Sequence, residues 1–196
     1  MNTLLIFASS NKHKAAEIEK MLPSDYYIQT MKDAGYTEDI SEPYATLEEN
    51  SKHKAETVFR TLGHNCFAED TGLETEVLDG APGVRSARYA GEPANDANNI
   101  SKLLQELYGQ LNRKAQFKTV LTLILKGETF QFTGICKGVI ANSPSGEKGF
   151  GYDPVFIPEG EEKTFAEMTL DEKNLFSHRR KAVQQLIRFL QLRKAG

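Results

Sequence analysis

The sequence predicts an α/β fold built on a mixed central sheet with flanking helices. Up to residue 70, apolar runs of strand length alternate with segments whose apolar residues recur at helical spacing. Farther along, two strand-like runs are joined by the short turn Lys126-Gly127-Glu128, which is the arrangement of an antiparallel hairpin. Alternating strands and helices favour parallel pairing and a hairpin imposes antiparallel pairing, so we expect both in one sheet.

The first 70 residues supply three predicted strands and two predicted helices. The strands are expected at residues 4–8, 26–30 and 65–68. The first helix ends before Pro23, while the second starts at a capping box of Thr46 and Glu49 and ends at Gly63. The apolar residues at helical spacing are Ala15, Ile18, Met21 and Leu22 in the first helix and Leu47, Ala55, Val58, Phe59 and Leu62 in the second.

The second half of the chain predicts a helix, the hairpin and a final helix. A loop rich in Gly and Pro at residues 79–93 precedes the first of these helices. The hairpin strands are expected at residues 117–125 and 129–140. The apolar positions of the two helices are Ile100, Leu103, Leu104 and Leu107, and then Ala182, Val183, Leu186, Ile187 and Leu190.

Length and composition favour one domain, residues 1–196, with room for two lobes. The formal net charge of -3 argues against a nucleic-acid partner, because polyanion binders carry a basic excess. No apolar run is long enough for a bilayer and no basic leader precedes the first strand, so we expect a cytoplasmic protein with no membrane partner. Cys66 and Cys136 lie in predicted strands and are expected to be buried free thiols, which suits a reducing compartment.

Two neighbouring acids, Glu69 and Asp70, directly follow the apolar run at residues 66–68 and precede Thr71 and Gly72. We expect the strand to end here and to present both carboxylates. Burying an unpaired carboxylate costs several kcal/mol, so acids beside a core strand need a cationic partner, and a metal ion is favoured. One alternative stays open, in which the two acids simply begin a solvated turn.

Two predicted helix starts carry basic residues where the helix dipole would favour acids. Free backbone N–H groups at such a start can bind an anion, so both segments are candidate phosphate sites. For the first, a short solvated turn stays open as an alternative. For the second, the helix can instead begin earlier, at a capping box of Thr169 and Glu172, which would leave His178 to Arg180 on a solvated face in the middle of the helix. The two segments are Ser9, Ser10, Asn11, Lys12, His13 and Lys14, and then Ser177, His178, Arg179 and Arg180.

The segment from Gly149 to Pro154 combines two glycines with two aromatic residues. Glycine lets a backbone approach a ligand closely, and an aromatic ring offers a face on which a nucleobase can stack. The alternative is a purely structural role, in which the segment is a hairpin turn and its aromatic side chains cover the core. The candidate ligand-binding residues here are Phe150, Gly151, Tyr152 and Asp153.

Together these segments resemble the family of inosine and xanthosine triphosphate pyrophosphatases, over nearly the whole chain. Several motifs occur in the family's order, which makes the resemblance specific. Ser9, Ser10 and Thr71 depart from the usual threonine, glycine and serine, and none of these changes removes a charged or metal-binding group. The motifs are residues 9–14, Glu69-Asp70-Thr71-Gly72, Gly80-Ala81-Pro82-Gly83, Ser86-Ala87-Arg88-Tyr89, residues 149–154, and Glu172-Lys173 leading to Ser177-His178-Arg179.

The resemblance implies an elongated mixed sheet, two lobes enclosing a nucleotide cleft, and a homodimer. It also implies one or more Mg²⁺ ions per subunit, held by Glu42 and Asp70, whose oxygens suit that ion. Glu49 is a weaker candidate ligand, because its place in the capping box already explains it.

The implied reaction is hydrolysis of a nucleoside triphosphate between its α and β phosphates, which releases a monophosphate and pyrophosphate. Asp70 would orient or deprotonate the attacking water, aided by Glu69. The triphosphate would be held by residues 9–14, Lys54 and Lys173, and Thr71 is a further substrate-binding residue. The base would be held by Phe150, His178, Arg179 and the rest of residues 150–153.

The implied substrates are the non-standard purine nucleotides ITP, dITP and XTP, which the enzyme would remove from the nucleotide pool. A donor aimed at the 6-oxo group would meet an amino group in adenine, and such a site can discriminate by about 10⁴. How guanine is excluded does not follow from the sequence. Arg88 can serve either the nucleotide or a dimer contact. Two rival functions stay open: a related pyrophosphatase for modified pyrimidine nucleotides, and a module that binds nucleotides without cleaving them.

Overall fold

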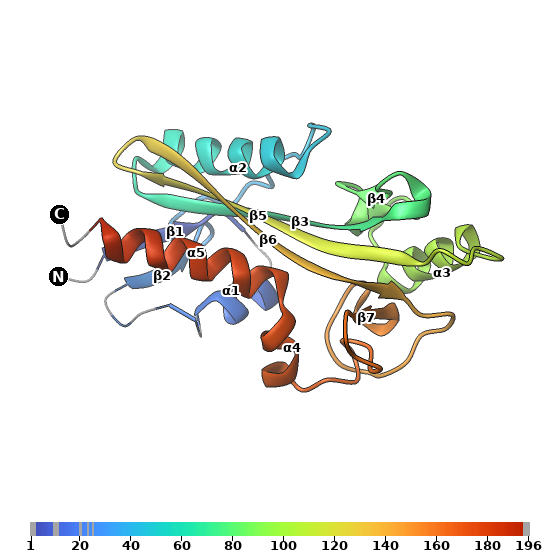
Figure 1. Cartoon of the computed structure of the whole chain (residues 1–196). Coiled ribbons are helices and arrows are strands. Elements are labelled where there is room, and N and C mark those ends of the chain that lie inside the picture. Colours follow the sequence, from blue (N-terminus) through green and yellow to red (C-terminus); the bar gives the residue numbers. More distant parts are fainter. Residues whose placement is uncertain (1–2, 10–11, 20, 23, 25, 194–196) are drawn as a thin grey trace. The chain divides into compact units, whose positions relative to one another are not determined.

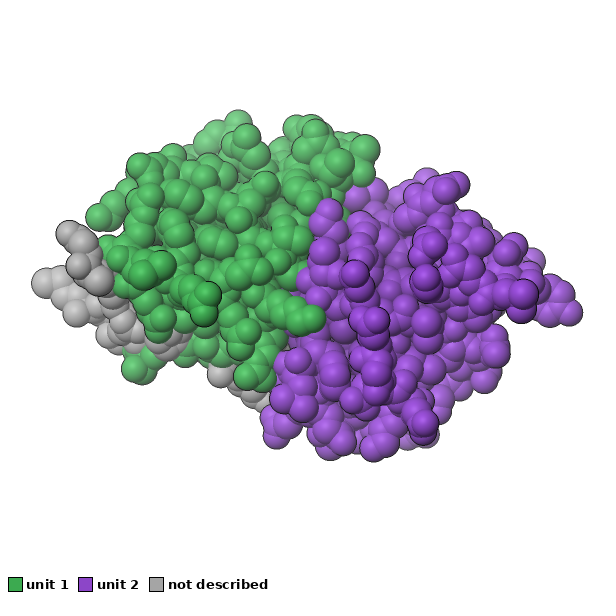
Figure 2. All heavy atoms as spheres, viewed as in Figure 1, with its two compact units in different colours: residues 1–70, 119–134, 179–196 green, residues 71–118, 135–178 purple. Residues whose placement is uncertain are grey.

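The computed structural model describes residues 3–9, 12–19, 21–22, 24 and 26–193, and of residues 12, 13, 16 and 17 the backbone alone. The chain divides into two compact units, each assembled from separate stretches of sequence (Figure 2). Unit 1 comprises residues 1–70, 119–134 and 179–196, and unit 2 comprises residues 71–118 and 135–178.

The described residues form a mixed sheet with helices, as the sequence predicts (Figure 1). The strand order is β2-β1-β3-β5-β6-β7, and β4 pairs with β3. β1 runs parallel to β2 and β3, whereas β4 and β7 run antiparallel to β3 and β6. The elements are β1 (Thr3–Phe7), α1 (Lys12–Glu19), β2 (Tyr26–Thr30), α2 (Leu47–Leu62), β3 (Cys66–Thr75), β4 (Pro82–Gly83), α3 (Asp96–Glu106), β5 (Lys114–Leu125), β6 (Glu128–Ile140), β7 (Phe156–Pro158), α4 (Leu170–Phe176) and α5 (His178–Leu192).

Unit 1 has a core on each face of its strands, because successive side chains of a strand point to opposite faces. Leu5, Phe7 and Phe67 pack with α1 and α5 on one face. Ile6, Ala8, Cys66 and Ala68 pack with α2 on the other face. Figure 1 shows α2 on one side of β1 and β3, with α1 and α5 on the other. Strands covered on both faces read as continuous apolar runs, which is how β1 appears in the sequence.

Unit 2 has a core of its own. Its members come from the ends of β3, β5 and β6 that belong to this unit, from α3, and from the segment that follows β6. Phe117 and Phe156 meet edge to face with ring centroids 4.7 Å apart. The buried residues of this core are Leu73, Ile100, Leu103, Leu107, Ala115, Phe117, Cys136, Ile140, Tyr152, Val155, Phe156, Phe165 and Met168.

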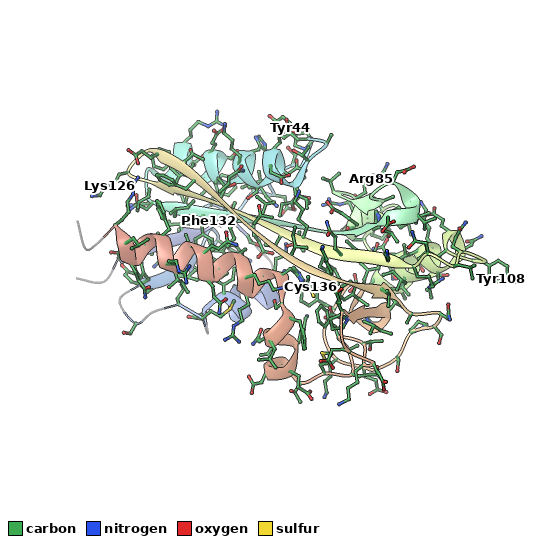
Figure 3. The ribbon with its side chains drawn as sticks, viewed as in Figure 1. Tyr44, Arg85, Tyr108, Lys126, Phe132 and Cys136 are labelled. Atoms are coloured by element: carbon green, nitrogen blue, oxygen red, sulfur yellow. The ribbon has the colours of Figure 1, made fainter. Side chains whose placement is uncertain are left out.

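The predicted helix caps and the hairpin turn are confirmed. The Thr46 hydroxyl accepts the backbone N–H of Glu49 and donates to its carboxylate, and Gly63 ends α2 with a φ of 68°. The two residues between β5 and β6, Lys126 and Gly127, both have positive φ, as a two-residue hairpin turn requires. Lys126 is labelled at this turn in Figure 3.

The first helix is shorter than predicted, because α1 ends at Glu19 and not just before Pro23. Met21 and Leu22 still pack against the unit 1 core, so their apolar spacing reflects burial and not helix. Both cysteines are buried free thiols, as predicted. Burial raises the pKa of the Cys66 thiol to about 12. Within the part of the chain that the structure describes, every helix is too short or too polar to span a membrane.

Candidate active site

The strand that carries the two acids does not end at them. β3 continues through Glu69 and Asp70 to Thr75, so the prediction of a strand end is wrong. β5 is the neighbour of β3 on the other side of the sheet path from β1, and beyond the acids β4 pairs with β3. Gly72 permits this pairing, since a Cβ there would lie 2.5 Å from the Gly83 carbonyl oxygen. The open alternative of a solvated turn is also wrong, because Glu69 is 1% exposed and Asp70 is 6% exposed.

The alternation of the strand sends the two carboxylates to opposite faces of unit 1. Asp70 shares the face of Cys66 and Ala68, on which α2 packs, and its carboxylate meets Lys54 of that helix. Glu69 shares the face of Phe67, on which α1 and α5 pack. Each acid therefore has its own set of cationic partners.

Lys54 lies between two carboxylates. Its Nζ donates to Oδ1 of Asp70 at 2.9 Å and to Oε1 of Glu42 at 2.7 Å. The side chains of Lys54 and Asp70 are 9% and 8% exposed, so the contact is screened from solvent. The other oxygen of Asp70, Oδ2, is buried and has no hydrogen-bond partner among the described residues. A buried carboxylate oxygen without a partner is costly and points to a missing ligand.

The loop that carries Glu42 is tied to α2 by a residue that the sequence analysis does not single out. Asn50 is fully buried and clamps the backbone of Tyr44: its side chain accepts the Tyr44 N–H at 2.9 Å and donates to the Tyr44 carbonyl at 3.0 Å. Figure 3 labels Tyr44 beside the start of α2. The sequence holds one weak signal for this clamp, an asparagine at helical spacing from the apolar residues Leu47 and Val58.

Glu69 is held by two cations. Arg179 of α5 donates to it in the two-pronged manner that suits a carboxylate, through Nε at 2.8 Å and Nη2 at 3.0 Å. Lys14 of α1 lies 3.0 Å from Oε1 of the same carboxylate. Arg179 is 2% exposed, so this group forms part of the interior of unit 1.

These contacts shift the pKa values of the two acids in opposite directions. Burial alone would raise the pKa of Glu69, but the charges of Arg179 and Lys14 outweigh it and hold that pKa well below the usual range. Burial raises the pKa of Asp70. The positive charge of Lys54 opposes this rise and the negative charge of Glu42 adds to it, so that the pKa of Asp70 is raised overall. Burial alone would lower the pKa of Lys54, but Asp70 and Glu42 together raise it, so Lys54 stays protonated. Asp70 is thus the more basic of the two acids.

The segment predicted as a phosphate loop is described in part. Ser9 follows β1 and is half-buried, and α1 begins at Lys12. Lys14 is directed to Glu69, as above. Ser10 and Asn11 lie outside the described residues, as do the side chains of Lys12 and His13.

A second group of predicted residues is assembled within unit 2. Oδ2 of Asp153 accepts from the Phe150 N–H at 3.0 Å and from Lys173 Nζ at 2.8 Å. Lys173 Nζ also lies 5.1 Å from the centroid of the Phe150 ring. Gly149 makes room for this group, because a Cβ there would lie 2.0 Å from Oδ2 of Asp153.

The remaining predicted residues of unit 2 are fixed by packing. His178 is buried and stacks on Phe117 with ring centroids 4.7 Å apart and an interplanar angle of 15°. Tyr152 belongs to the core and its hydroxyl donates to the Ser86 carbonyl at 2.9 Å. The Gly151 N–H donates to Oδ2 of Asp96, and Thr71 is half-buried on β3.

The capping box predicted by the alternative reading forms, but the helix that it starts does not continue through His178 and Arg179, and both side chains are buried, so a solvated mid-helix face is wrong. Thr169 and Glu172 form the capping box of α4, which ends at Phe176. Ser177 then interrupts the helical path, and α5 starts at His178. His178 and Arg179 therefore lie in the first turn of a new helix, where the dipole favours a bound anion.

The donor set around Asp70 fits a magnesium ion. No group of three or more His, Cys, Asp or Glu side chains is arranged for a metal among the described residues. Mg²⁺ does not need such a group, because it is usually held by one or two carboxylates together with waters and substrate phosphates. Asp70 and Glu42 supply two carboxylates, and the unpartnered Oδ2 of Asp70 is a free oxygen donor.

Comparison with known proteins identifies the family. The model of the Ham1 family matches residues 5–189. The chain belongs to the Ham1 family. A dITP/XTP pyrophosphatase of Flavobacterium johnsoniae is 53% identical over 186 residues, which cover 95% of this chain and 97% of that protein. One of Flavobacterium psychrophilum is 52% identical over 185 residues, covering 94% of this chain and 97% of the relative.

A solved Ham1 structure has the same fold. The Ham1 protein of Staphylococcus aureus superposes with a TM-score of 0.89 at 38% sequence identity, over 96% of this chain and 98% of that one. The mixed sheet with flanking helices is therefore the Ham1 fold.

Proposed function

We propose that this Ham1 protein hydrolyses non-standard purine nucleoside triphosphates, namely ITP, dITP and XTP, to the monophosphate and pyrophosphate. The observation that carries the proposal is Asp70, a buried carboxylate with a raised pKa, one oxygen on Lys54 and the other without a partner among the described residues. The names of its relatives, dITP/XTP pyrophosphatases at 52% and 53% identity, support the same reaction.

Asp70 is proposed to act as the general base. Its buried Oδ2 has no hydrogen-bond partner among the described residues, so it is available to accept a proton from a water molecule. Magnesium, held by Glu42 and Asp70, would supply charge neutralisation at the phosphate oxygens. Lys54 and Lys14 add positive charge on the same unit, and the start of α1 lies at the end of a helix dipole that favours an anion.

Glu69 is proposed to position other groups and not to activate water. Its carboxylate is bonded to Arg179 and Lys14, and its lowered pKa makes it a poor base. Its charge fixes Arg179 in the first turn of α5 and Lys14 in the first turn of α1. The predicted direct catalytic role of Glu69 therefore gives way to a structural one in this proposal.

The unit 2 group is proposed to bind the base. Phe150 offers a ring face. Lys173, which the resemblance gives to the triphosphate, is given to the base in this proposal because its Nζ lies beside the Phe150 ring. Lys173 and His178 can donate hydrogen bonds to a 6-oxo group, which hypoxanthine and xanthine carry and adenine lacks. Asp153 accepts from both the Lys173 ammonium and the Phe150 backbone N–H, so it fixes the position of the ammonium relative to the Phe150 residue.

Substitution of Asp70 by asparagine tests the catalytic assignment. The change keeps the size of the side chain and removes the base, so pyrophosphate release from ITP should fall by about 10²–10⁴. Circular dichroism checks that the variant is folded. An Asp70→Asn protein with wild-type turnover would overturn the assignment.

We further propose a homodimer in the cytoplasm. The two buried free thiols, Cys66 and Cys136, suit a reducing compartment. The homodimer is inferred from the family resemblance. Analytical ultracentrifugation of the purified protein measures its oligomeric state directly.

A further inference from the structure

Lys54 bridges the two carboxylates that the proposed function gives to the magnesium ion. Its ammonium contacts Oε1 of Glu42 at 2.7 Å and Oδ1 of Asp70 at 2.9 Å. The same two carboxylates are the proposed metal ligands. One small site is therefore shared by two cations, the ammonium on its own side chain and a divalent ion from solution.

The ammonium meets an electrostatic need of the unliganded protein. Glu42 and Asp70 lie against the same Nζ atom, so their negative charges are close together. Asp70 is 6% exposed, and solvent cannot screen that repulsion well. Lys54 offsets part of that repulsion and holds both carboxylates in place before any ligand arrives.

The same contact makes the ammonium a competitor of the metal. A divalent ion bonded to these carboxylates would meet a positive charge hydrogen-bonded to both of them, in a setting where charge interactions are strong. The metal can bind fully only if the ammonium moves. A triphosphate offers it a new partner, because phosphate oxygens are anionic acceptors.

We propose that Lys54 is an exchangeable counter-ion, which holds Glu42 and Asp70 in the absence of ligand and transfers to the triphosphate when the metal binds. This proposal rests on the proposed function for the identity of the two ligands. The exchange couples the two binding events: the metal alone binds weakly, and the triphosphate strengthens its binding by removing the competitor. Such coupling is reciprocal.

Calorimetric titration of Mg²⁺ into the protein without nucleotide tests the exchange. The Lys54→Met variant keeps the length of the side chain and removes the charge, so it should bind Mg²⁺ about tenfold more tightly than the wild type. The matched control is Lys52→Met on the same helix, because Lys52 is exposed and its Nζ lies 3.7 Å from Oε1 of Glu56, away from the two acids. Lys52→Met should bind Mg²⁺ as the wild type does.

Thermal unfolding gives a second measurement. In EDTA the Lys54→Met protein should melt below the wild type, because its two carboxylates lack a cation, and Mg²⁺ should restore most of the difference. If Lys54→Met does not fold, Lys54→Gln replaces it, since the amide can still donate to both carboxylates without carrying charge.

Equal or weaker Mg²⁺ binding by the folded Lys54 variants would overturn the exchange. That result is distinct from failure of the proposed function, because the titration contains no nucleotide. If the wild type released no pyrophosphate from any triphosphate while Lys54→Met bound Mg²⁺ more tightly, the counter-ion role would stand and the proposed reaction would fall.

Discussion

Glu69 and Asp70 are neighbours in the chain with opposite chemical properties. Glu69 is bonded to Arg179 and Lys14, and its pKa is lowered; Asp70 keeps a buried oxygen without a partner among the described residues, and its pKa is raised. The cause is the alternation of β3, which turns one carboxylate toward α1 and α5 and the other toward α2. Sequence proximity alone would have given both acids the same role.

The lowered pKa of Glu69 predicts a specific loss of stability in acid. A carboxylate whose folded pKa lies below its unfolded value, about 4.3, stabilises the fold above that pH. The stabilisation disappears as the pH falls from there toward the folded pKa. Between about pH 4 and pH 3, the free energy of unfolding of the wild type should fall more steeply than that of Glu69→Gln, by up to about 1.4 kcal/mol per pH unit.

Urea unfolding at several pH values measures this slope. The control is Glu56→Gln, which removes an exposed carboxylate paired with Lys52 and should keep the wild-type slope. Equal slopes for the wild type and Glu69→Gln would show that Glu69 is not the ionised partner of Arg179 and Lys14.

Two helices hold neighbouring loops by the same device, a buried asparagine that clamps backbone. Asn50 of α2 bonds both the N–H and the carbonyl of Tyr44, in the loop that carries Glu42. Asn99 of α3 accepts from the Ala90 N–H and donates to the Ala87 carbonyl. The first clamp positions a proposed metal ligand, and the second positions a loop of unit 2.

Asn50→Ala should therefore weaken metal use as well as stability. Loss of the Asn50 side chain leaves backbone groups of the loop unpaired, so the free energy of unfolding should fall by about 1–3 kcal/mol. It also frees Glu42, so the Mg²⁺ concentration that half-saturates pyrophosphate release should rise about tenfold. Asn99→Ala is the matched control and should lose similar stability with unchanged metal dependence. If both variants shift the metal dependence equally, the Asn50 clamp has no special relation to Glu42.

The turn before Asp153 depends on a glycine for space. Gly149 has a φ of 80°, and an added Cβ would lie 2.0 Å from Oδ2 of Asp153. Gly149→Ala should displace Asp153 from Lys173 and raise KM for ITP. The control is Gly160→Ala, which should cause backbone strain alone, because Gly160 has a φ of 87° and no atom lies within 4 Å of an added Cβ. The difference in KM between the two variants measures the steric effect. No difference would remove the Asp153 group from base binding.

Local sequence signals predicted the elements well and the site less completely. The caps of α2 and α4 and the turn at Lys126-Gly127 follow from side-chain chemistry within a few residues, and the structure confirms them. The extent of β3 cannot be predicted from such local chemistry, because its second half is mostly polar and is fixed by pairing with β4. The contact of Glu69 with Arg179 joins residues 110 positions apart, which no local pattern encodes.

Each of the two units carries one cluster of buried charges that its core cannot explain by packing alone. In unit 1 the cluster is built on β3, with Lys54, Glu42 and Asp70 on one face and Glu69 and Arg179 on the other. In unit 2 it is the pair of Lys173 and Asp153 beside the Phe150 ring. The proposed phosphate-binding residues belong to unit 1 and the proposed base-binding residues to unit 2.

The most direct measurement is pyrophosphate release by the purified protein from ITP, dITP, XTP, GTP, ATP and CTP, each with Mg²⁺ and with EDTA. Rapid release from ITP, dITP and XTP with Mg²⁺, abolished by EDTA and slow for ATP, is the predicted result. Release that continues in EDTA would contradict the metal assignment, and a preference for CTP would contradict the base assignment. Absence of release from every nucleotide would contradict the proposed reaction and leave a protein that binds nucleotides without cleaving them.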